Sequence, residues 1–157
     1  MEAKIDNPGV FVPPPLFYAI IFFISILIQK FLPINSPIFT SIIFYVLGWL
    51  FLAIYFIFAL PAIIKFIKTK NTLITIKPAK SLQTAGIYFV TRNPMYLGLL
   101  FLYAGLGLLF GNLWTLILIP ILIFIINTFV IKNEERYLER TFGESYTEYK
   151  TKTRRWI

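Results

Sequence analysis

The sequence contains neither cysteine nor histidine. The absence of cysteine excludes disulfides and thiol nucleophiles. The absence of histidine excludes imidazole acid–base chemistry, and together the two absences exclude the usual nitrogen- and sulfur-rich sites for zinc and other transition metals. We therefore expect no metal site. Any chemistry must rely on carboxylates, arginine, lysine, tyrosine or a bound cofactor.

Charge is also scarce. Only 14% of the 157 residues are charged and 58% are hydrophobic, whereas a soluble domain has about 25% charged and about 45–50% apolar residues. The apolar residues form four blocks, at 16–32, 38–64, 95–110 and 113–131. A bilayer core requires roughly 20 apolar residues in a helix, and the two shorter blocks need flanking residues or a thinner bilayer. We therefore predict an all-α integral membrane protein with about four transmembrane helices.

The positive charges lie on one side of this arrangement. The net charge is +8, and the cations cluster between the second and third blocks and after the fourth, with Lys30 alone near the opposite side. Because positively charged loops stay in the cytoplasm, both termini and the loop 65–93 are predicted to be cytoplasmic, and the protein to be a multi-pass protein of the cell (inner) membrane. Attraction to anionic lipid accounts for most of these cations. Membrane lipids are thus expected partners, and nucleic acid is not.

We predict one domain over residues 1–157. It comprises a proline-rich extended arm (1–15), a first helical pair (16–64), a cytoplasmic loop (65–93), a second helical hairpin (94–131) and a cytoplasmic tail helix (132–157). Pro61 is expected to kink or end the second helix. The alternating stretch "TLITIKP" in the loop is too short to predict a sheet.

The tail predicts an amphipathic helix on the membrane surface. Its apolar stripe recurs at helical spacing and consists of Ile131, Leu138, Phe142, Tyr146 and Tyr149. Gly143 is a point where this helix can be interrupted.

Two carboxylates disturb this amphipathic pattern. Glu135 falls on the apolar stripe and Glu134 lies one step round the helix. A carboxylate on a buried face is costly unless it is paired, and an acidic residue at membrane depth is a functional candidate. Nearby Lys132, Arg136 and Arg140 are alternative, purely structural partners. The spacing alone leaves a functional site and a structural ion-pair network equally open.

The tetrad Thr91-Arg92-Asn93-Pro94 stands before the third block. Asparagine is a favoured N-cap residue and proline a favoured first helical residue, so Asn93-Pro94 predicts a helix start. This interpretation does not account for Tyr88, Arg92 or Tyr96. A helix N-terminus with an adjacent arginine is also suited to binding an anion.

"GIYFVTRNPMYLG" followed by "NEERYLERTFGESYTEYKTKTRRW" resembles the isoprenylcysteine carboxyl methyltransferase family and its phospholipid N-methyltransferase relatives. The family pattern is Arg-His-Pro-x-Tyr, a hydrophobic stretch and Glu-Glu. The resemblance implies an integral-membrane methyltransferase that converts S-adenosylmethionine to S-adenosylhomocysteine without a Rossmann domain. It also implies a set of residues that line or support the cofactor pocket: Tyr88, Arg92, Asn93, Pro94, Tyr96, Gly98, Glu134 and Glu135.

One position departs from that pattern. Asn93 stands where the family has histidine. Asparagine does not titrate, so any base role of that histidine is absent here. We expect Asn93 to have a structural and cofactor-contact role instead.

The predicted reaction is methyl transfer to a carboxylate or an amine of a lipophilic acceptor. A carboxylate needs a cation to orient it, and the candidates are Arg92, Arg136, Arg154 and Arg155. An amine must lose a proton, and Glu134 or Glu135 is the candidate acceptor. Two alternatives stay open: a nicotinamide-dependent membrane double-bond reductase and a non-catalytic lipid-binding scaffold. The sequence makes no prediction of the oligomeric state.

Overall fold

The two longest helices are apolar along most of their length. In the computed structural model, which describes residues 8–10, 12–35, 37, 41–69, 79 and 81–157, α1 spans Pro14–Phe31 and α2 spans Ile42–Lys68. By length and composition both are able to cross a membrane. The described residues are otherwise helices and connections, with no strand among them. The all-α prediction is therefore confirmed for this part of the chain.

The boundaries of both helices differ from the predicted ones. α1 begins at Pro14, inside the predicted arm, because proline is tolerated in the first turn, where its missing N–H is not needed. α2 continues through Pro61 to Lys68, so this proline does not end the helix. The stretch "TLITIKP" lies outside the described residues.

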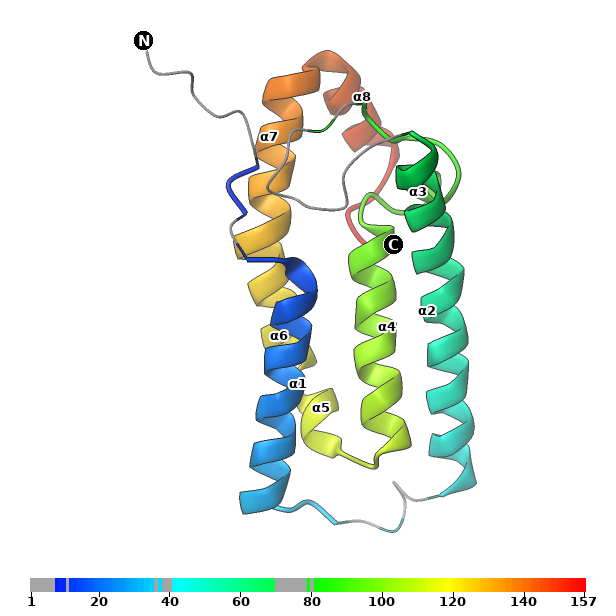
Figure 1. The fold of residues 1–157 in the computed structure, drawn as a ribbon, viewed down its shortest axis with the longest axis vertical. Helices are drawn as coiled ribbons and strands as arrows, with labels where there is room; N and C mark the ends of the chain where they lie inside the picture. Colours follow the sequence, from blue (N-terminus) through cyan, green and yellow to red (C-terminus); the bar gives the residue numbers. More distant parts are fainter. Residues whose placement is uncertain (1–7, 11, 36, 38–40, 70–78, 80) are drawn as a thin grey trace.

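α4 (Pro94–Leu109) lies between α1 and α2 and packs most extensively against α2 (Figure 1). Glycines allow this close approach. A Cβ atom on Gly105 would lie 3.0 Å from the carbonyl oxygen of Gly48, and a Cβ atom on Gly98 would lie 3.3 Å from that of Tyr55. The small residues of the third apolar block therefore serve helix packing.

The fourth apolar block forms a segmented helical rod. α5 (Leu113–Ile117), α6 (Ile119–Ile125) and a π-helix, η2 (Ile126–Ile131), lead directly into α7 (Lys132–Phe142) (Figure 1). The predicted third and fourth spans thus correspond to α4, with 16 residues, and to this divided segment. Two helices satisfy the length criterion for a span, and the count of four stays a prediction.

The chain turns back at the end of α7. Gly143, with φ of +54°, joins α7 to α8 (Glu144–Lys152), so residues 132–157 contain two helices instead of the single predicted one. After α8, residues 153–157 run back to the beginning of α4, which is preceded by the short α3 (Ile87–Val90). This return brings α7, the end of α8 and the beginning of α4 to the same end of the molecule (Figure 1).

Candidate functional site

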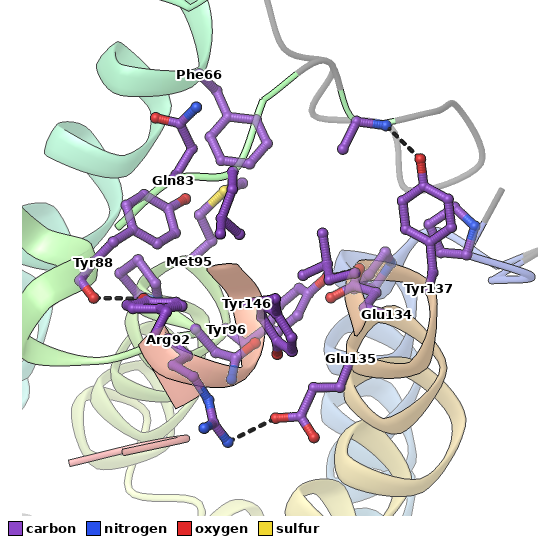
Figure 2. Close-up of a pocket in the computed structure, with 18 of the residues that line it drawn as sticks. Phe66, Gln83, Tyr88, Arg92, Met95, Tyr96, Glu134, Glu135, Tyr137 and Tyr146 are labelled. Atoms are coloured by element: carbon purple, nitrogen blue, oxygen red, sulfur yellow. Dashed lines mark hydrogen bonds and ion pairs between the residues drawn. The ribbon is translucent and has the colours of Figure 1, made fainter. Parts of the chain in front are cut away.

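A cavity of about 340 Å³ lies at the N-terminal end of α4. Its walls come from the beginnings of α1 and α4, the end of α2, α3, α7, α8 and the segment before α3 (Figure 2). Seven of the eight residues that the resemblance implies for the cofactor pocket line it: Tyr88, Arg92, Asn93, Pro94, Tyr96, Glu134 and Glu135. Residues separated by some 40 positions in the sequence therefore share one pocket.

Glu135 binds two guanidinium groups. Arg92 Nη2 lies 2.8 Å from Glu135 Oε1, and Arg155 donates from Nε and Nη2 to both carboxylate oxygens, at 3.1 and 2.6 Å. The side chains of Arg92 and Glu135 are each only 9% exposed. The carboxylate on the apolar stripe is thus neutralised by long-range partners, one of them from the tail beyond α8.

Arg92 also binds the end of α8. Its Nη1 donates to the carbonyl oxygens of Lys150 and Thr153, at 3.0 and 3.2 Å, and its backbone N–H donates to Arg154 O at 3.0 Å. The last carbonyls of a helix lack partners within the helix and carry partial negative charge, so a cation there is favourable. Arg92 Nε is buried without a hydrogen-bond partner in the described part of the chain.

Asn93 occupies the N-cap position of α4 with Pro94 after it, as the sequence predicts, but its side chain makes no capping hydrogen bond. The Asn93 amide instead donates to Arg155 O at 2.9 Å. The Thr91 hydroxyl donates to the same oxygen at 3.1 Å and accepts from the Asn93 N–H at 3.2 Å. Asn93 therefore joins α4 to the C-terminal segment.

Glu134 lies in a different environment from Glu135. Its Oε1 accepts a hydrogen bond from the Tyr96 hydroxyl at 2.6 Å, and no salt bridge to it is formed within the described residues. Burial raises the pKa of the Glu134 carboxyl to about 7; the negative charge of Glu135 also raises it, and the Tyr96 hydrogen bond lowers it. Near neutral pH this carboxyl is therefore able to take up or release a proton.

Tyrosines form much of the remaining wall. Tyr149 donates to Tyr88 O at 2.5 Å, and the Tyr137 hydroxyl accepts the N–H of Ala79 at 2.9 Å (Figure 2). Burial raises the pKa of the Tyr88 and Tyr146 hydroxyls, so both stay protonated. The sequence placed Tyr146 and Tyr149 on the apolar stripe but did not indicate that they face a cavity.

Two predicted site residues lie elsewhere. Gly98 faces α2, next to Tyr55 O and Ala59, and is not part of the cavity wall. Arg136 is exposed on the outer side of α7 and does not line the cavity either. Arg155, which the sequence offered only as one of several cations, is the tail arginine that binds Glu135.

Comparisons with known proteins agree with the motif. The model of the phospholipid methyltransferase family matches residues 43–145, more than half of the chain. An uncharacterized protein of Haemophilus influenzae is 44% identical over 63 residues, which are 40% of this chain and 100% of that protein. The protein-S-isoprenylcysteine O-methyltransferase of Schizosaccharomyces pombe is 35% identical over 71 residues, 45% of this chain but only 30% of that enzyme.

No solved structure matches the chain significantly. The family assignment therefore depends on the sequence, in which the matched region contains both the Arg-Asn-Pro segment and the two glutamates that meet at the cavity. The resemblance identified from the motifs is confirmed, and the chain belongs to the phospholipid methyltransferase family.

Proposed function

We propose that this protein is an integral-membrane methyltransferase that uses S-adenosylmethionine to methylate the carboxylate or amine of a lipophilic acceptor. One observation carries the proposal: Glu134, without a cationic partner among the described residues, lies at the same cavity as the Arg92–Glu135 ion pair. The match of residues 43–145 to the phospholipid methyltransferase family supports this reaction class.

The residues present fit the cofactor. A volume of about 340 Å³ lies within the range of roughly 300–1,000 Å³ that is usual for small-molecule sites. An ionised Glu134 is suited to accept hydrogen bonds from ribose hydroxyls, and the tyrosine rings are suited to contact a cationic ligand. When bound, S-adenosylmethionine supplies a methyl group on a positively charged sulfur. We propose that Tyr88, Arg92, Asn93, Pro94, Tyr96, Glu134 and Glu135 hold it.

The two classes of acceptor require different functions of the residues at the site. An amine is protonated at neutral pH and must lose a proton before it attacks, and Glu134, with a pKa of about 7, is the group to accept it. A carboxylate requires no base. It is attracted by the positive charge that remains when two guanidiniums, Arg92 and Arg155, share the single carboxylate of Glu135. In both cases the cavity orients the reactants and excludes water.

The outer surface supports a membrane location. The outward side of α2 exposes large apolar side chains, including Ile42, 73% exposed, and Trp49, 55% exposed, and few residues of this helix are buried. Exposed apolar side chains in this number mark a surface that contacts a membrane or another protein. Lys65, Lys68, Lys132 and Arg136 lie near the cavity end of the molecule, which supports a cytoplasmic position of the site by the positive-inside rule.

Calorimetric titration of the detergent-purified protein tests the cofactor. We expect S-adenosylhomocysteine to bind and reduced nicotinamide adenine dinucleotide phosphate not to bind. The reverse result would contradict the methyltransferase proposal and favour the reductase, and binding of neither would favour the lipid-binding scaffold.

The acceptor class is tested separately. Lipid extracts are incubated with the protein and with S-adenosylmethionine labelled in its methyl group, and the labelled lipids are treated with mild alkali. A methyl ester releases volatile labelled methanol, whereas an N-methyl group retains the label. Absence of any labelled lipid, with a cofactor that binds, would exclude the lipids of that extract as acceptors.

A further inference from the structure

We propose that Arg155 is a positioning residue of this site, which holds Glu135 and, through Glu135, fixes Arg92 and the beginning of α4 at the cavity. The choice of S-adenosylhomocysteine as the ligand rests on the proposed function. The positioning of Glu135 and Arg92 by Arg155 rests on geometry alone. Arg155 lies outside the cavity wall, so it acts through Glu135.

The first observation is the geometry of the carboxylate. Glu135 Oε2 is bound only by Arg155 among the described residues, and Oε1 is shared between Arg92 and Arg155. The two-point contact of a guanidinium fixes the plane of the carboxylate as well as its position. Without the Arg155 side chain, Oε2 of the buried Glu135 carboxylate has no partner in the described part of the chain. A buried charged oxygen without a partner destabilises the fold, so Glu135 would move to find another partner.

The second observation is that the contact is part of a closed circuit. Arg155 binds Glu135, and Glu135 binds Arg92. Arg92 in turn donates to the carbonyls of Lys150 and Thr153, which lie five and two residues before Arg155 in the chain. The backbone N–H of Arg92 donates to Arg154 O, which adds a second connection between the same two segments. A shift of any one member therefore disturbs the rest.

The third observation concerns the residue that replaces the histidine of the family pattern. The carbonyl oxygen of Arg155 accepts hydrogen bonds from both the Thr91 hydroxyl and the Asn93 amide. The backbone of Arg155 thus fixes the residues on either side of Arg92, while its side chain fixes the carboxylate that Arg92 binds. Arg155 therefore positions Arg92 in two ways, through its backbone carbonyl and through its side chain.

The test compares Arg155→Gln with Lys152→Gln. Both variants remove one positive charge from the same tail, but Lys152 is exposed and pairs with Glu148 on the surface. Hydrogen exchange of the backbone amide of Arg92 is measured first, without ligand. We expect exchange to accelerate about tenfold or more in Arg155→Gln and to stay unchanged in Lys152→Gln. Equal exchange in the two variants would overturn the inference, whether or not the wild type binds a cofactor.

The affinity for S-adenosylhomocysteine is the second readout. We expect a loss of about 10-fold or more in Arg155→Gln, partial recovery in Arg155→Lys and little change in Lys152→Gln. Because Arg155 acts through Glu135, adding Arg155→Gln to a Glu135→Gln variant should cause little further loss. Additive losses would overturn the inference.

If Arg155→Gln does not fold, Arg155→Lys is compared with Lys152→Gln. A partial loss of affinity in Arg155→Lys alone supports the inference, and equal affinities of the two variants overturn it. A wild type that binds no S-adenosylhomocysteine contradicts the proposed function and leaves the exchange result to decide this inference.

Discussion

The hydroxyl of Tyr96 on α4 donates a 2.6 Å hydrogen bond to Glu134 on α7. The next residue, Glu135, is bound by two arginines instead. Two successive carboxylates therefore have opposite surroundings, one facing a neutral phenol and one facing two cations. Such a difference separates their tasks: Glu135 orders the site through its ion pairs with Arg92 and Arg155, and Glu134 is left available to a ligand or a proton.

Glu134→Gln should weaken the binding of S-adenosylhomocysteine by about 10- to 100-fold, because a hydrogen bond to a charged acceptor contributes about 1.5–3 kcal/mol. Calorimetric titration at pH 8, where the wild-type carboxyl is ionised, measures the loss. The matched control is Glu139→Gln on the same helix, because Glu139 pairs with Lys150 on the surface away from the cavity. Equal affinities of the two variants would remove Glu134 from the ligand site.

The stability of the protein should depend on pH through the same carboxyl. Its pKa is raised from 4.5 to about 7 in the folded state, so folding favours the protonated form. This contribution is fully present below pH 4.5 and is lost as the pH rises through 7, with a total on the order of 3 kcal/mol. Glu134→Gln should therefore unfold at a higher temperature than the wild type at pH 8. At pH 5 the difference should be small.

Thermal unfolding in detergent at the two pH values checks this prediction. A Glu139→Gln control corrects for the general loss of one acidic side chain, because the exposed Glu139–Lys150 pair contributes little. A wild type that is as stable as Glu134→Gln at pH 8 would show that ionisation of the half-buried Glu134 carboxyl does not destabilise the fold.

Tyr96→Phe should move the titration of Glu134 to higher pH. The hydroxyl stabilises the ionised carboxylate, and its removal leaves burial and Glu135 to raise the pKa further. If ligand hydroxyls bind the ionised form, the affinity for S-adenosylhomocysteine rises with pH through about 7 in the wild type and at a higher pH in Tyr96→Phe. Titrations between pH 6 and 9 measure both midpoints, and identical midpoints would contradict the proposed coupling.

Local patterns in the sequence predicted part of this arrangement. Asn93-Pro94 predicted the beginning of α4, and the position of Glu135 on an apolar stripe indicated that it is buried and paired. The partners of Glu135 were not predictable, because Lys132, Arg136 and Arg140 are closer in sequence than Arg92 and Arg155. The choice among them depends on the reversal at Gly143 and on the return of residues 153–157 to α4. Gly98 and Arg136 do not line the cavity, because sequence proximity to a motif does not define the direction in which a residue faces.

Gly107→Ala should destabilise the protein more than Gly98→Ala. A Cβ atom on Gly107 would lie 2.7 Å from the Cβ and Cγ2 atoms of Thr115, which is buried and also hydrogen-bonded to Ser25. Overpacking of this kind costs about 1–3 kcal/mol. On Gly98 the nearest atoms lie at 3.3–3.4 Å, a contact that a small shift of α2 relieves. Thermal unfolding of both variants in one detergent measures the difference. Because Thr115 lies at the far end of α4 from the cavity, the folded Gly107→Ala protein should retain its affinity for S-adenosylhomocysteine, and a lost affinity would show that packing at the far end controls the site.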